Sequence, residues 1–408
     1  MRLDSFAKNN ILMFFASSIG SFFNLFYQLI MLRLLSAEAF ASLNSLLSLL
    51  VIISVPVSAF NIMVTKHISS HHARNKFEDL AAIWRKLSTH TFLFGLALLV
   101  LIFIFRNNIA HFLRIGSSRG IVILAGIFFL SALSSVINGG LQGLERFRWL
   151  ALVAVAAGLL KLLISAGLLR QFPGSLEVAL FGFWLPILIS VLLGAWPLRF
   201  LFRSRVKEKI RLKGLYLYIL PVLSTGICFA LLTNIDMVLV KHFFTRDAQD
   251  YAIAQMIGKI ILSVSGVIYV VMFSRASNLH ARKEGSRGIL KRSLFFTFIL
   301  SALAAIVYNI FPGLIFRALA GSVSRQAILL ARVFSASMLL YALSNVLFYY
   351  QLSIERYRFI RPLLIITALQ VIAICFFHHT TLIVASISLI GALSIFLFNL
   401  RSSFKIEA

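Results

Sequence analysis

The chain has 408 residues, 60% of them apolar and 13% charged, with a formal net charge of +26. A soluble domain of this length cannot bury so much apolar surface, so the composition excludes an ordinary soluble enzyme or binding protein. The excess of Lys and Arg would indicate nucleic-acid binding in a soluble protein, but it is typical of cytoplasmic loops in a membrane protein, and no nucleic-acid partner is expected.

The apolar residues fall in blocks of about 20, the length that a helix needs to cross a bilayer. We predict an all-α membrane protein with about twelve transmembrane helices joined by short connections. The predicted spans are 11–35, 40–65, 88–106, 121–143, 150–169, 176–201, 215–242, 250–274, 290–310, 327–350, 362–378 and 381–400.

Basic residues are divided unequally between the two ends of these spans. The side with both chain ends carries 27 of the 39 Lys and Arg residues, the opposite side carries 9, and the other three lie inside spans. Short cytoplasmic loops collect Lys and Arg. We therefore predict that both termini are cytoplasmic.

The two halves of the chain share a short motif. The most basic connection, 199–214, separates two sets of six predicted spans, and LLSAEA at 34–39 matches FFTRDA at 243–248 in the first outer turn of each set. We predict two six-helix bundles, 1–205 and 206–408, related by a pseudo-two-fold axis along the membrane normal. The hydroxyl and acid of each motif also suit the start of a helix, which is the simpler explanation for those two residues.

One acid, Asp236, lies deep within a predicted span and not at its end. Asp236 is about 9 Å from the outer end of the seventh span, and Lys259 is about 12 Å deep in the eighth, at 1.5 Å per helical residue. Opposite charges at similar depth lower each other's cost of burial. The pair is either a structural link between neighbouring helices or a working pair that couples transport, and the sequence leaves both open.

Three cations lie deepest in the predicted spans: Lys161, Lys259 and Arg332. Long basic side chains near helix ends often extend to the membrane surface, but for these three we favour a water-filled cavity. Three cations against one acid make such a cavity positive, which suits an anionic substrate. We predict all three as substrate-binding residues.

Motifs for several other chemistries are absent from the sequence. It has no GxxxxGK[ST] for nucleotide phosphates, no HEXXH and no paired CxxC. The histidines of KHISSHH, at 66–72, lie in a basic loop with no cysteine, so we interpret them as solvated residues. No catalytic residue, metal or cofactor is predicted.

The run NIDMVLVKHFFTRDAQDYAIAQMIGKI, at 234–260, resembles the start of the second half in bacterial polysaccharide and oligosaccharide (O-antigen type) flippases. That family is similar to the lipid II flippases and the multidrug MATE exporters. The matching residues are Asp236, Thr245, Tyr251, Gly258 and Lys259, and RLLSAEAF at 33–40 resembles the family's opening. The chain departs from the family where Gln and Asp, at 249–250, precede the tyrosine in place of glycine.

The resemblance implies two bundles that form a V around a central cavity in the bacterial inner membrane. It also implies a substrate made of sugars on polyprenyl pyrophosphate, which the protein would turn to the outer face by alternating access for surface polysaccharide (lipopolysaccharide) synthesis. The implied partners are this lipid-linked oligosaccharide, membrane lipids, and the glycan polymerase and glycosyltransferase machinery.

Two other classes stay open. A MATE-like drug or cation antiporter has the same architecture, but it favours acids in its cavity, and here cations outnumber acids within the spans. A membrane-embedded polysaccharide polymerase or acyltransferase needs clustered catalytic residues, which the sequence does not offer.

Overall fold

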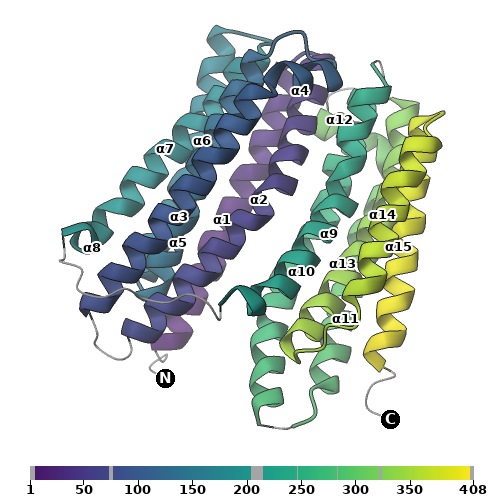
Figure 1. The fold of residues 1–408 in the computed structure, drawn as a ribbon. Helices are drawn as coiled ribbons and strands as arrows, with labels where there is room; N and C mark the ends of the chain where they lie inside the picture. Colours follow the sequence, from purple (N-terminus) through teal and green to yellow (C-terminus); the bar gives the residue numbers. More distant parts are fainter. Residues whose placement is uncertain are drawn as a thin grey trace. The chain divides into compact units, whose positions relative to one another are not determined.

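The computed structural model describes residues 5–72, 77–203, 215–245, 247–282, 284–320 and 324–404. These ranges consist of helices joined by short turns and loops, without a strand (Figure 1). The helices are α1 (Ser5–Leu34), α2 (Ala37–His72), α3 (Phe77–Ile104), α4 (Arg106–Phe112), α5 (Arg119–Gly143), α6 (Phe147–Gln171), α7 (Leu176–Ala195), η1 (Trp196–Leu198), α8 (Arg199–Arg203), α9 (Leu215–Phe243), α10 (Ala248–Ala281), α11 (Arg287–Ile310), α12 (Pro312–Ala320), α13 (Arg325–Ser353), α14 (Ile360–Phe376) and α15 (Thr381–Phe404).

Each predicted span overlaps one of the main helices, and the span 176–201 also includes η1 and the start of α8. Ten helices of the described chain are long and apolar enough to cross a membrane, and α14 is a shorter apolar helix. The largest differences are at α3, which begins at Phe77, and at α2 and α10, which continue to His72 and Ala281. The histidine-containing stretch at 66–72, expected in a loop, therefore belongs to α2. Hydropathy detects only the apolar part of a helix. The helix itself can continue into polar sequence, because its backbone hydrogen bonds are made within the helix. The complete twelve-span topology stays a prediction.

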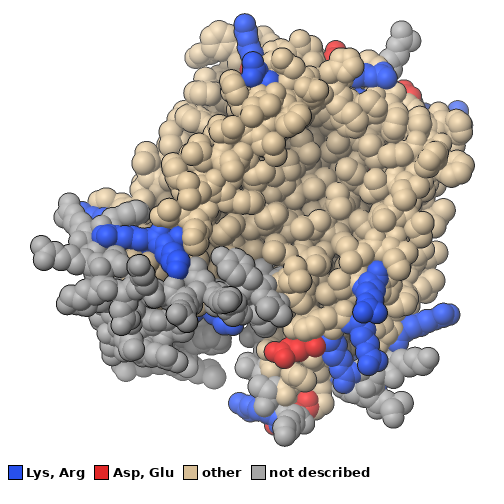
Figure 2. Space-filling model, in the orientation of Figure 1, with Lys and Arg blue, Asp and Glu red and all other residues tan. Residues whose placement is uncertain are grey.

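Membrane-facing surface is visible in the burial pattern. Large apolar side chains such as Leu163 (58% exposed), Leu303 (58%) and Leu369 (58%) stand on the outside of their helices. On the face drawn in Figure 2, the Lys and Arg side chains gather toward the helix ends, and uncharged residues form the surface between them. An apolar surface of this extent is unfavourable in water and favourable in contact with lipid.

The chain divides into two compact units, Met1–Ile219 and Leu220–Ala408. The predicted boundary between the bundles, at 205–206, lies outside the described residues. Each unit has its own core: in the first, Trp84 packs with residues of α2, α5 and α7, and in the second, Tyr350 packs with residues of α10 and α11. We describe the two units separately.

The order of elements in the first unit recurs in the second. Three long helices, one short helix and three long helices form α1–α7, and the same order forms α9–α15. The packing pairs also recur: α2 packs on α5 as α10 packs on α13, and α5 packs on α7 as α13 packs on α15. This agreement, together with the shared motif at 34–39 and 243–248, supports a common origin of the two halves by duplication.

Serine residues begin several of these helices. The Ser36 hydroxyl accepts from the backbone N–H of Ala39 at 3.3 Å, as the motif at 34–39 predicts. Ser175 accepts in the same way from Val178 at the start of α7, and Ser324 from Ala327 at the start of α13. Each bond satisfies a backbone donor that the first turn of a helix leaves free.

Candidate functional site

Lys161 lies in the interior of the N-terminal unit. It is the only charged residue in the middle of α6, and its side chain is 9% exposed. Its ammonium donates to Asn24 Oδ1 on α1 and lies 4.4 Å from the ring centre of Tyr27 and 4.7 Å from that of Phe183. Ring faces attract a cation. The side chain is therefore held by an amide and two rings, without a carboxylate among these contacts.

A glycine on α7 brings Phe183 close to Lys161. A Cβ at Gly182 would lie 2.4 Å from Ser165 Oγ and 2.8 Å from Ser165 Cα on α6, so only glycine allows this approach of the two helices. Pro186 follows one turn later, and because proline lacks an N–H it weakens the helix at that point. The local sequence thus fixes Phe183 over the ammonium.

Lys161 lines a cavity of about 370 Å³ between α1, α6 and α7. A second cavity of about 500 Å³ lies between α2 and α5, and Ile187 of α7 lines both. The second cavity has no charged residue in its lining. Its hydroxyl and amide side chains are Ser54, Ser58, Asn61, Ser131, Ser134, Ser135 and Asn138.

Part of this polar lining joins α2 to α5. Asn61 Nδ2 donates to the carbonyl of Ser135 at 3.0 Å, and the Ser135 hydroxyl donates to the carbonyl of Val57 at 2.7 Å. Other groups have unused capacity: within the described chain, the buried Oδ1 of Asn138 accepts no hydrogen bond. The wall therefore combines rigid helix packing with groups that can bind a polar, uncharged ligand.

Asp236 is the buried acid of the C-terminal unit and is 1% exposed. Tyr251 donates its phenolic hydroxyl to Oδ2 at 2.8 Å, and Gln255 donates its amide to Oδ1 at 2.8 Å. Both carboxylate oxygens of Asp236 are thus satisfied by side chains of α10.

Lys259 belongs to the same network and is partly buried. Its ammonium donates to Gln255 Oε1 at 3.0 Å and to Asn234 Oδ1 on α9 at 2.8 Å. The Gln255 amide therefore connects the predicted pair, giving its N–H to Asp236 and its carbonyl oxygen to Lys259. Tyr251, Gln255 and Lys259 follow at intervals of four residues, which places them on one face of α10.

A second buried network lies in the same unit. The Tyr341 hydroxyl donates to Gln370 Oε1 at 3.0 Å, and Gln370 donates to the carbonyl of Leu232 on α9 at 3.1 Å. A Cβ at Gly391 on α15 would lie 2.1 Å from Gln370 Oε1, so a larger residue there would displace this amide. The Tyr341 hydroxyl also lies 3.2 Å from the carbonyl of Ser388 on α15, so this network links α9, α13, α14 and α15.

Arg332 differs from the two lysines because it is exposed on α13. The four predicted site residues are thus divided. Lys161 lies in the N-terminal unit, and the other three lie in the C-terminal unit, where only Asp236 and Lys259 share a network.

The described residues include no group of His, Cys, Asp and Glu side chains that could hold a metal ion. Several functional candidates were not singled out from sequence: Asn24, Tyr27 and Phe183 around Lys161, and the serines of α2 and α5. A signal for the polar walls exists, because Ser17, Ser21 and Asn24 recur at helical spacing in α1, as Ser54, Ser58 and Asn61 do in α2.

The whole described chain has the fold of a known class of membrane transporters. It superposes on an inward-facing multidrug resistance MATE family transporter of the MOP superfamily with a TM-score of 0.78, at 13% identity, covering 95% of this chain and 96% of that chain. It superposes on the lipid II flippase MurJ in an inward closed conformation with a TM-score of 0.72, at 16% identity, covering 97% and 87%.

A third similar structure is a MOP superfamily transporter from Pyrococcus furiosus, described as having a binding pocket of reverse polarity that suggests a different function. Its TM-score is 0.62 at 14% identity, covering 98% of this chain and 95% of that chain. No family model and no curated protein sequence matches the chain. The superpositions show that the fold is shared. Identities this low do not carry the substrate over, which must be argued from the residues.

Proposed function

We propose that the protein translocates an oligosaccharide linked to polyprenyl pyrophosphate across the bacterial cytoplasmic membrane, as a step in surface polysaccharide synthesis. The two units would open alternately to the two faces of the membrane. No bond is made or broken in this process, and the protein acts as a transporter and not as an enzyme.

The observation that carries the proposal is Lys161 at the wall of a cavity inside the N-terminal unit. A phosphate group that enters the membrane needs a compensating charge, and a cation in a low-dielectric site provides it strongly. In the first 200 residues Lys161 is the only charge in the middle of a predicted span. An anionic group therefore meets one cation and no opposing acid at that depth.

The neighbouring cavity between α2 and α5 supports the sugar part of the substrate. Sugars expose many hydroxyl groups, and each must exchange its hydrogen bonds with water for bonds with the protein. Serine and asparagine side chains such as Ser58 and Asn138 both donate and accept, which suits such a ligand. The two cavities together offer one charged and one neutral polar region.

A MATE-like exporter of cations is the second candidate, because the fold fits it equally well. Such a substrate requires an accessible acid, for which Asp236 is the natural choice. Both oxygens of Asp236 are already bonded within the unit. We therefore prefer the anionic substrate.

Purified protein in liposomes tests the choice. Fluorescent glycolipids on a polyprenyl pyrophosphate carrier should become accessible on the opposite leaflet, and cationic dyes should not be transported. Transport of dyes without glycolipid translocation would favour the exporter instead.

The orientation is tested by reporter fusions. Because Lys and Arg are concentrated on one side, fusions after residues 75, 210 and 285 should report the cytoplasm. Fusions near residues 115 and 320 should report the outer side. One reversed reading in either group would contradict the twelve-span topology.

A further inference from the structure

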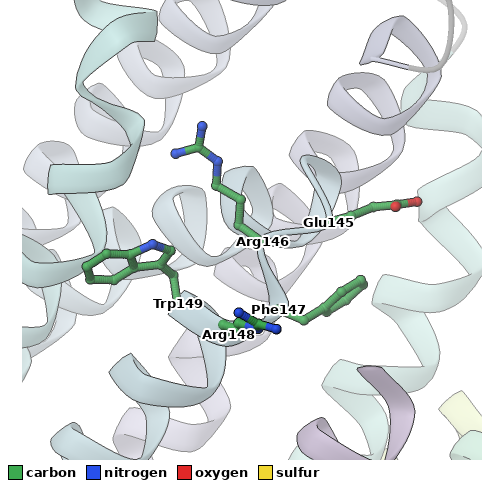
Figure 3. A pocket seen from close by; sticks show the side chains of 5 residues that line it. All are labelled: Glu145, Arg146, Phe147, Arg148 and Trp149. Carbon is green, nitrogen blue, oxygen red and sulfur yellow. The ribbon is translucent and has the colours of Figure 1, made fainter. Parts of the chain in front are cut away.

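A basic and aromatic cluster surrounds the corner between α5 and α6. The chain leaves α5 at Gly143, turns through Glu145 in a left-handed conformation (φ 57°), and enters α6 at Phe147. Residues Glu145 to Trp149 line a hollow of about 310 Å³ at this corner (Figure 3). It lies on the N-terminal unit, at the end of α6 opposite Arg170, away from the neighbourhood of Lys161.

The corner is fixed to the end of α7. Arg146 donates to the carbonyl of Pro197 in η1, and its guanidinium lies 5.1 Å from the ring centre of Phe200 in α8. These contacts hold the loop against the following helices, so the hollow has a defined wall.

Two of the four tryptophans of the chain lie beside the hollow. The rings of Trp149 and Trp196 are 5.3 Å apart, and the guanidinium of Arg199 lies 5.0 Å from the ring centre of Trp196. Trp196 is 56% exposed, and Arg199 is also exposed. Tryptophan next to arginine at the end of a transmembrane helix is typical of the membrane interface, where one part of each side chain meets lipid and another meets water.

Basic side chains and exposed apolar side chains lie near each other at the hollow. Arg148 is exposed beside Trp149, whereas the Glu145 side chain extends to the opposite side of the loop (Figure 3). One helical turn after Arg148 on α6, Leu152 is 50% exposed, and one turn before Trp196 on α7, Leu192 is 63% exposed. The surface thus offers guanidinium groups above an apolar strip.

We propose that this corner binds the headgroup of an anionic phospholipid, with the phosphate at Arg148 and Arg199 and an acyl chain along Leu152 and Leu192. Guanidinium groups bind phosphate oxygens in pairs, and the tryptophan rings cover the glycerol region. Basic pockets at helix ends select anionic lipids in the same physical way. The site is separate from the cavities of the proposed transport path.

Native mass spectrometry of the full chain, released from nanodiscs that contain phosphatidylglycerol and phosphatidylethanolamine, tests the proposal. The double variant R148Q/R199Q should bind phosphatidylglycerol roughly 25-fold more weakly, at about fivefold per arginine near an anionic surface. The variant R148K/R199K should bind more strongly than R148Q/R199Q because it keeps both charges, and more weakly than the wild type because lysine cannot hold two phosphate oxygens at once. High salt should weaken binding to the wild type.

The matched control is R119Q/R170Q, which removes two exposed arginines at the other ends of α5 and α6. Its phosphatidylglycerol binding should stay within about twofold of wild type, because these residues lie away from the cluster. An equal loss of phosphatidylglycerol binding in both double variants would show that only the net charge of the protein matters, and it would overturn the proposal. Excess inorganic phosphate should not displace the lipid, since it cannot use the apolar strip; displacement would identify a soluble anion site instead.

Discussion

In the N-terminal unit, α1, α6 and α7 hold Lys161 between an amide and two rings, at the edge of a cavity. In the C-terminal unit, α9 and α10 hold Asp236 and Lys259 in one closed set of hydrogen bonds. The order of helices is the same in both units. The same order of helices therefore holds a single cation beside a cavity in the N-terminal unit. In the C-terminal unit it holds an acid and a cation whose hydrogen bonds are made within the protein.

The difference teaches that burial alone does not identify a binding residue. Asp236 is more deeply buried than Lys161, at 1% against 9% exposed, but its polar contacts are already complete. Lys161 has one oxygen partner and a cavity beside it, so it can gain a ligand without breaking its surroundings. We therefore expect substitutions in the C-terminal network to reduce mainly stability, and substitutions of Lys161 to reduce mainly transport.

The largest expected effect is on stability, from Asp236→Ala. The substitution removes the acid and leaves Lys259 and two polar groups of α10 without it, and breaking a buried charge pair costs about 3 to 5 kcal/mol. Unfolding in a denaturing detergent should show the loss. The double variant with Lys259→Ala should recover part of it, and strictly additive losses would show that the two charges are not coupled.

The same double variant separates structure from function. If the pair couples transport, a well-folded Asp236→Ala/Lys259→Ala protein should reach the membrane in normal amount and fail to translocate glycolipid. Full translocation by that variant would assign the pair to structure alone.

The next largest effect is on transport, from Lys161→Gln. Loss of one charge-assisted contact to phosphate should slow glycolipid translocation roughly 10-fold to 100-fold, with the amount of protein unchanged. Lys161→Arg should lose less. Arg170→Gln, at the exposed end of the same helix, is the matched control and should transport at the wild-type rate. Normal transport by Lys161→Gln would remove the main support for an anionic substrate.

A smaller effect is expected from Gly182→Ala, which tests how the N-terminal site is positioned. The new methyl would collide with Ser165 and push α7 from α6, at a cost of about 1 to 3 kcal/mol. Gly167→Ala, where a Cβ meets nothing within 4 Å, should be neutral or slightly stabilising. Equal thermal stability of the two variants would contradict the close approach of the helices.

The smallest effect is expected from Arg332→Gln. This side chain is exposed on α13 and lines neither of the two cavities described above, so we expect it to hold a substrate less closely than Lys161 does. Its loss should slow translocation by no more than about fivefold, and Arg332→Lys should be closer to wild type. A loss as large as that of Lys161→Gln would place both cations on the same substrate path.

The helices were predictable from sequence because a membrane span must be long, apolar and internally hydrogen-bonded, and each property leaves a local signal. The partners of the charges were harder to predict. Asn24 meets Lys161 from a helix far away in the chain and Phe183 meets it from the next helix, and only packing brings them together. For Asp236, the sequence pointed to Lys259, whereas the structure places Gln255 and Tyr251 on its two oxygens.

The side chains between Asp236 and Lys259 have a common property. Tyr251, Gln255 and Asn234 can each donate or accept a hydrogen bond, and none carries a charge. They behave like a few water molecules fixed in place, which solvate an anion at one end and a cation at the other. Rotation of an amide group by 180° exchanges its donor and acceptor positions without changing its shape. The network could therefore accommodate Asp and Lys exchanged between the two helices, with the amides reversed to match.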